Sequence, residues 1–105
     1  MVYELVFAPP AQEDLKSNFV YVADASGIET ATEYDAKIRA ACLSLTRFPN
    51  RGTPRDDIRP GLRSIPLGGA VTIFYEVAPD EVRIVRVIHA RRDLAAAFED
   101  SRESP

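Results

Sequence analysis

Residues 63–93 read RSIPLGG, AVTIFYEV, APDE and VRIVRVIHARRD in succession, and this stretch decides the fold. The runs at 70–77 and 82–89 are rich in β-branched and aromatic residues. The short turn at 78–81 separates them, which predicts a β-hairpin. A further run at 62–67 predicts a strand before it. Because the last run is apolar at both odd and even positions, we expect a central strand, covered on both faces over part of its length. Arg83 and Arg86 interrupt that cover on opposite sides.

The N-terminal half predicts one strand and two helices. Residues 2–7 alternate between two faces, as a strand with one well-buried side does. Pro9 and Pro10 end that strand and suit the first turn of a helix, which runs to about 26–27. A second apolar stripe predicts another helix that Pro49 stops, antiparallel to the first because the connection at Gly27 is short. Residues 49–61 are too rich in Pro and Gly for regular structure, and we expect a long loop.

The order strand, helix, helix, strand, strand, strand predicts an α+β domain, in which a helical hairpin covers one face of a mostly antiparallel sheet. A short helical turn is expected at 93–98. We assign residues 1–98 to a single domain and expect 99–105 to be a frayed tail. The side chains expected in the core include Ile38, Leu45, Phe48, Ile73 and Tyr75.

Size and composition limit the possibilities. The chain has 105 residues, of which 46% are hydrophobic and 28% charged, enough for one small core. No run approaches the ~18 apolar residues of a membrane span, and the start at residues 1–4 lacks a basic segment followed by an apolar one, so we expect a cytoplasmic protein. Cys42 is the single cysteine and lies in an apolar stripe, so we expect a buried thiol. We expect no cofactor and no metal.

The net charge of −3 conceals an uneven distribution. Residues 1–46 carry −4, residues 47–92 carry +4, and residues 93–105 carry −3. The positive charge of 47–92 is all arginine, which binds carboxylates or phosphates through two parallel hydrogen bonds. Either an anionic partner meets these side chains, or they pair with nearby Asp and Glu. Five of these arginines recur every fourth residue: Arg47, Arg51, Arg55, Arg59 and Arg63. We treat this spacing as coincidental, because the prolines in the segment forbid a continuous helix.

The motifs of this chain resemble the ParE branch of the ParE/RelE toxin superfamily, from the first strand to Asp93. The diagnostic positions are Arg63, Ile65, Pro66, Gly68, Ile73-Phe74-Tyr75, Val77, Arg86-Val87-Ile88-His89 and Arg92-Asp93. The resemblance implies the same fold and a toxin of a type II toxin–antitoxin system. Such a toxin poisons DNA gyrase by trapping its cleaved DNA complex, is neutralised by a tightly bound antitoxin, and has no chemistry of its own.

The alternative implied by the superfamily is a ribosome-dependent mRNA endonuclease of RelE type. That branch has an Arg within the strand matching 70–77 and a Tyr in the terminal segment, where this chain has Thr72 or Ile73 and Phe98. Phe98 has no hydroxyl for acid–base chemistry. Those nucleases are also strongly basic, whereas this chain is acidic. A third interpretation is a non-toxic binding module.

The candidate functional residues follow from the resemblance and from the charges. Besides target contact, His89 could join a nuclease set with neighbouring arginines, or cap the end of its strand. No catalytic residue is assigned. The expected partners are DNA gyrase and a cognate antitoxin, ParD-like or another small DNA-binding protein; membrane binding is not expected and direct nucleic-acid binding is disfavoured. The candidates for target binding are Arg63, His89, Arg91 and Arg92, and those for antitoxin binding are Arg83, Arg86, Phe19 and Tyr34.

Overall fold

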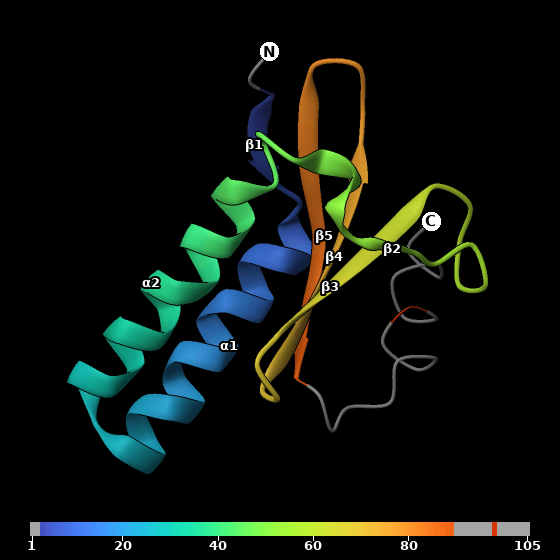
Figure 1. Cartoon of the computed structure of the whole chain (residues 1–105). Coiled ribbons are helices and arrows are strands. Elements are labelled where there is room, and N and C mark those ends of the chain that lie inside the picture. Colours follow the sequence, from blue (N-terminus) through green and yellow to red (C-terminus); the bar gives the residue numbers. More distant parts are fainter. Residues whose placement is uncertain (1–2, 90–97, 99–105) are drawn as a thin grey trace.

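A computed structural model describes residues 3–89 and residue 98. Two helices follow a first strand, and strands then lead to His89, where the continuously described part ends (Figure 1). The sheet has five strands in the order β1-β5-β4-β3-β2, antiparallel except for the parallel pair β1 and β5. The bounds are β1 Glu4–Phe7, α1 Pro9–Ser26, α2 Ile28–Ser44, the 3₁₀ helix η1 Pro49–Arg51, β2 Thr53–Pro54, β3 Leu62–Leu67, β4 Val71–Val77 and β5 Glu81–His89.

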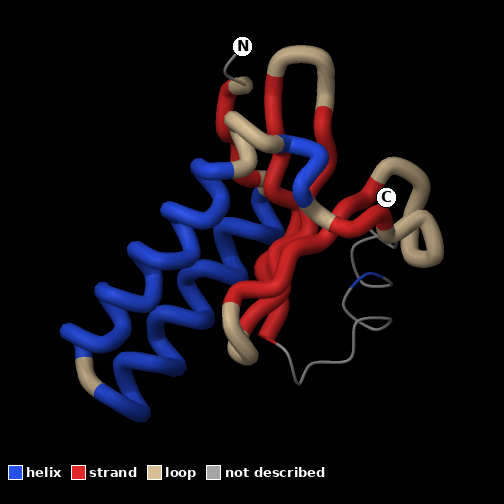
Figure 2. Tube along the Cα trace, viewed as in Figure 1, coloured by secondary structure: helices blue, strands red, loops and turns tan. Residues whose placement is uncertain are grey.

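The predicted α+β arrangement is confirmed: both helices lie on one face of the sheet (Figure 2). The short strand β2, which pairs with β3, was not expected, because the loop composition argues against regular structure. Strand β2 has only two residues, which is too short for an alternating pattern of apolar and polar residues to mark it in the sequence. The helical turn expected at 93–98 and the tail 99–105 lie outside the described residues, apart from Phe98.

Local sequence explains the helical hairpin. Pro9 and Pro10 occupy the first turn of α1, where no backbone N–H is needed. Gly27 joins the helices with a φ of 94°, a conformation that other residues rarely adopt. Ala11 of α1 and Ala31 of α2 are both fully buried.

The core has a layer on each side of the sheet. Ile38, Leu45, Ile73 and Tyr75 are buried in the layer under the helices, as predicted. Cys42 is also fully buried there, and burial raises the pKa of its thiol to about 12. The other layer contains Leu62, Phe74, Val85, Ile88 and Phe98.

The expectation that Phe48 belongs to the core was wrong. Phe48 is 62% exposed. Helix α2 ends at Ser44, and residues 45–47 form a turn, so the helical period no longer applies four residues later. Phe48 instead precedes η1, with φ −129° and ψ 67°.

A β-bulge in β5 lies beside the end of β1. Phe74 pairs with Arg86 and Tyr75 with Ile84, so Val85 is the additional residue. Strand β1 ends opposite Ile84, and none of the described strands pairs with the rest of β5 on that side. There Asp14 of α1 accepts hydrogen bonds from Arg86 Nε and Nη2, at 2.8 and 2.9 Å, and from the Val87 N–H at 2.8 Å. Asp14 therefore replaces the missing strand as hydrogen-bond partner and holds α1 to the sheet.

Tyr75 fixes the turn that follows α2. Its buried hydroxyl donates to the Pro49 carbonyl and accepts from the Gly52 N–H, both at 2.8 Å. A Cβ at position 52 would lie 2.5 Å from this hydroxyl oxygen, so only glycine permits the approach. On the same turn, Arg63 Nη1 donates to the carbonyls of Gly52, at 2.7 Å, and Asn50, at 3.2 Å.

We predict that Tyr75→Phe destabilises the fold by about 1–3 kcal/mol, because two buried backbone groups lose their partner. Urea unfolding measures this, with Tyr3→Phe as the matched control, since the Tyr3 hydroxyl bonds to no described residue. Burial also raises the pKa of Tyr75 above 10. The unfolded chain thus loses this proton first, and stability falls as the pH rises past 10. The Tyr75→Phe variant should lack the part of this alkaline loss of stability that comes from Tyr75. Equal unfolding free energies for Tyr75→Phe and Tyr3→Phe would contradict the role of the Tyr75 hydroxyl.

Candidate functional site

Arg86 is not available to a partner. Its side chain is 8% exposed and is held by Asp14, itself 8% exposed, so the idea that Arg86 meets an antitoxin carboxylate does not fit the structure. The sequence pattern placed Arg83 and Arg86 on opposite faces of an ordinary strand. The bulge at Val85 breaks that alternation, and no local signal marked the distant Asp14 as the partner.

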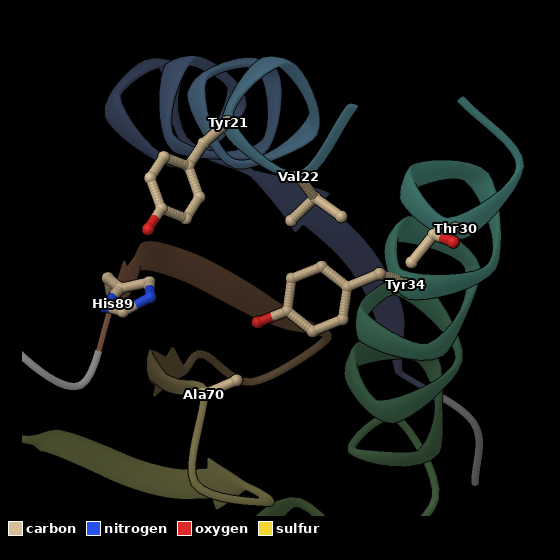
Figure 3. Close-up of a pocket in the computed structure, with 6 residues that line it drawn as sticks. All are labelled: Tyr21, Val22, Thr30, Tyr34, Ala70 and His89. Carbon is tan, nitrogen blue, oxygen red and sulfur yellow. The ribbon is translucent and has the colours of Figure 1, made fainter. Parts of the chain in front are cut away.

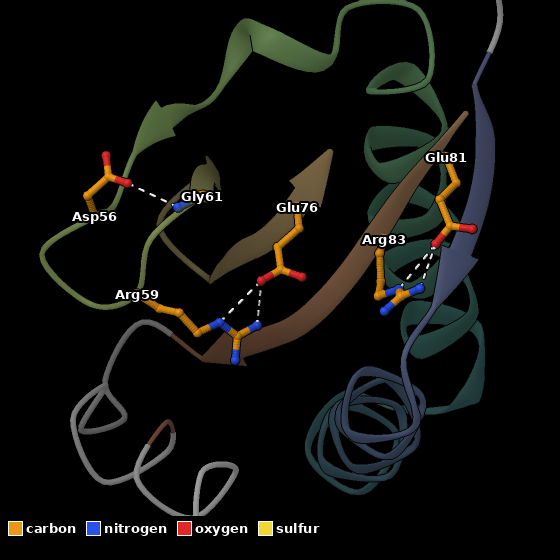
Figure 4. Close-up of polar contacts among 6 residues, drawn as sticks. All are labelled: Asp56, Arg59, Gly61, Glu76, Glu81 and Arg83. Carbon is orange, nitrogen blue, oxygen red and sulfur yellow. Dashed lines mark hydrogen bonds and ion pairs between the residues drawn. The ribbon is translucent and has the colours of Figure 1, made fainter. Parts of the chain in front are cut away.

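Arg83 is the exposed member of the predicted pair. It lies opposite Glu76 in the register, yet it forms its ion pair with Glu81 at 2.8 Å, while Glu76 pairs with Arg59 at 2.8 Å (Figure 4). The side chain of Arg83 is 53% exposed and could meet a partner carboxylate. In the adjoining loop, the Asp56 carboxylate accepts from the Gly61 N–H at 3.0 Å.

His89 and Tyr34 line one pocket of about 200 Å³ between the helical hairpin and the end of the sheet. Tyr21 and His89 meet edge to face, with ring centroids 5.9 Å apart. The Tyr34 ring faces them across the pocket (Figure 3). Partial burial raises the pKa of the Tyr34 hydroxyl, which therefore stays neutral. Val22, Thr30 and Ala70 complete the lining, so the pocket is apolar and aromatic and suits an apolar side chain.

Phe19 lies in a different hollow, of about 230 Å³, on the helical hairpin. Leu15 and Val20 contribute apolar surface beside it. Lys16 and Arg39 add positive charge at the same hollow; Arg39 pairs with Asp35 of its own helix at 2.7 Å. We call this hollow the hairpin groove. An amphipathic segment with acidic flanks would match its surface.

The four candidates for target binding do not form one described site. Arg63 is half-buried and holds the turn after α2 through two carbonyls. His89 lines the aromatic pocket at the other end of the sheet, as the strand register shows. Arg91 and Arg92 lie outside the described residues.

Most arginines of the described chain are paired locally. Of the eight in residues 3–89, five form ion pairs with carboxylates, which favours the local interpretation of the positive charge for those five. The Arg55 pair lowers the pKa of the exposed Asp57 carboxyl by hydrogen bonding. Such exposed pairs contribute little to stability. The three others are Arg47, Arg51 and Arg63.

Sequence reasoning missed Tyr21, Lys16 and Arg39. Tyr21 is 63% exposed, and no sequence pattern singled it out, yet its ring reaches His89. Lys16 and Arg39 come from different helices, so only the packing of α1 on α2 brings them to one groove. No signal in the sequence marked them as neighbours of Phe19.

Within residues 3–89 and 98, no group of three or more His, Cys, Asp or Glu side chains is arranged to hold a metal ion. The helices of that part of the chain are also not long and apolar enough to cross a membrane.

The comparisons with solved structures match this fold. One is titled as a chromosomal ParDE toxin–antitoxin system from P. aeruginosa; it covers 86% of this chain and 98% of its own, with a TM-score of 0.76 and 22% identity. Another, titled as the toxin–antitoxin complex RelBE2 from Mycobacterium tuberculosis, covers 85% and 99%, with a TM-score of 0.55 and 23% identity. At these identities, the likeness concerns the fold.

The sequence comparisons show the family. Toxin ParE3 of Caulobacter vibrioides is 31% identical over 87 residues, which are 83% of this chain and 86% of that protein. Toxin ParE1 of Mycobacterium tuberculosis is 31% identical over 90 residues, 85% and 91% of the two chains. The family model described as ParE toxin of type II toxin-antitoxin system, parDE, matches residues 5–94. The chain therefore belongs to the ParE toxin family of type II toxin–antitoxin systems.

Proposed function

We propose that this ParE-family toxin acts by binding DNA gyrase and trapping its cleaved DNA complex, and that a cognate antitoxin neutralises it. The observation that carries binding over RNA cleavage is the position of Phe98. This residue is 5% exposed and packs edge to face on Phe74, with centroids 5.0 Å apart. A buried phenyl ring in the place matched to the RelE tyrosine has no proton to transfer and does not meet RNA.

The β4 strand supports the same proposal. Ile73 is fully buried under the helices, and Thr72 is half-buried beside it. Neither side chain supplies the positive charge that a phosphorane requires. His89, together with Arg91 and Arg92 just after it in the sequence, remains a proposed target contact. We expect these residues to bind the target without catalysing a reaction.

The hairpin groove is the proposed antitoxin site. The titles of the two structural relatives describe toxin–antitoxin systems, and we extend that partnership to this chain. An amphipathic antitoxin helix would place apolar side chains on Phe19 and Leu15 and carboxylates near Lys16 and Arg39. Arg83 and Tyr34 are the further proposed contacts, on β5 and at the aromatic pocket.

We predict that the chain copurifies with the small protein encoded by the adjacent reading frame, and that Phe19→Ala weakens the complex by about 2 kcal/mol, or roughly thirtyfold. Ile28→Ala is the control, because Ile28 is 70% exposed and does not line the groove. Isothermal titration calorimetry measures both. Absence of any complex at micromolar concentration would refute the partnership, and equal affinities would refute the groove.

We predict that the purified chain inhibits gyrase supercoiling and accumulates cleaved plasmid, whereas translating ribosomes show no new mRNA cuts. Arg91→Ala and Arg92→Ala should each weaken inhibition by about 1–3 kcal/mol in affinity, and excess protein should restore it. Arg55→Ala serves as the control, since Arg55 pairs with Asp57. New mRNA cuts without gyrase inhibition would overturn the proposal in favour of the RelE-type endonuclease.

A further inference from the structure

The three arginines without a carboxylate partner gather at one turn. Arg47 forms no side-chain ion pair or hydrogen bond with a described residue. Arg51 donates to Ser44 Oγ at 3.2 Å, and Arg63 donates to two backbone carbonyls. These acceptors are neutral, so none of the three charges is paired with a carboxylate of the described residues. Arg47 and Arg51 also have no acid nearby in the sequence, because residues 36–55 contain neither Asp nor Glu.

Two large apolar side chains are exposed at the same place. Leu43 is 59% exposed and Phe48 is 62% exposed. Arg51 Nη1 bonds to Ser44, the residue that follows Leu43 in the chain, and the Arg51 N–H donates to the Phe48 carbonyl at 3.2 Å. We define the basic turn as Leu43, Arg47, Phe48, Arg51 and Arg63.

The basic turn is held in place before any partner arrives. Tyr75 bonds to both ends of the 49–52 segment, and Arg63 bonds to its carbonyls. A surface that is already ordered loses less conformational entropy on binding. Exposing a phenylalanine on a fixed turn does not help the monomer fold, so a role in recognition accounts for it better.

We propose that the basic turn docks an acidic surface of the target protein with an apolar side chain at its centre; the choice of the target rests on the proposed function. Phe48 and Leu43 would supply the apolar contact, and Arg47 and Arg51 would pair with carboxylates, the composition of a protein hot spot. Uncompensated charge also speeds the encounter with an acidic partner. None of the five residues lines the hairpin groove, so the antitoxin site leaves this surface to another partner.

The chemistry of the partner is tested on the isotope-labelled full chain by NMR. The probe is a short capped peptide alternating glutamate with leucine; a lysine–leucine peptide and duplex DNA are the comparisons. We expect the acidic peptide alone to shift the amide signals of residues 47, 48, 50 and 51. Binding should be about tenfold weaker for Arg47→Glu and unchanged for Lys37→Glu, the exposed control with the same charge change. No shift, or shifts with DNA alone, would overturn the proposal.

Whether the partner of the basic turn is the target of the toxin is tested by expressing the chain without antitoxin. Growth is followed at matched protein levels. We expect Arg47→Glu/Arg51→Glu to relieve growth arrest at least tenfold in viable count, while Lys37→Glu does not and the complex of the double variant with antitoxin persists. Undiminished arrest, or loss of the antitoxin complex, would overturn the assignment to the target. A wild-type chain that does not arrest growth would refute the proposed function instead, and the peptide titration then decides the docking chemistry by itself.

Discussion

The buried ion pair of Asp14 and Arg86 is the constraint on which the sheet and the helices depend. Strand β1 is too short to cover β5, so the second half of β5 would have an open edge with an unpaired N–H at Val87. The Asp14 carboxylate occupies that edge and accepts three hydrogen bonds. Two buried charges are expensive to desolvate, and such a pair is tolerated only with good geometry and satisfied partners, both of which are present.

The proposed surfaces of the toxin are arranged around this junction. Helix α1 carries Phe19 of the hairpin groove, and β5 carries His89 of the aromatic pocket, so the pair fixes one relative to the other. On β4, Tyr75 reaches from the same core to the turn after α2 and orders the basic turn. One small core thus positions two proposed partner surfaces on the helices and a third at the turn.

The sequence was sufficient where a pattern is local. The periods of 3.6 and 2 predicted both helices and the strands of the meander, and the motif at 63–93 identified the family. The sequence was insufficient where contacts between distant residues decide whether a side chain is buried and what it contacts. Phe48 is exposed because α2 ends early, Arg86 is buried because it pairs with Asp14, 72 residues away on a helix, and Tyr21 meets His89 only in three dimensions. Those are properties of packing, which spacing does not encode.

The dependence of the fold on the Asp14–Arg86 pair is tested most directly by urea unfolding. The free energies of unfolding of Arg86→Met and Arg83→Met are compared. Both variants remove one arginine from β5, but only Arg86 belongs to a buried pair; Arg83 is 53% exposed. Removing one partner of a buried pair leaves the other charge uncompensated, so Arg86→Met should cost about 3–5 kcal/mol. Arg83→Met should cost about 0–1 kcal/mol. Equal losses below about 1 kcal/mol in both variants would show that the structure does not depend on Asp14 and Arg86.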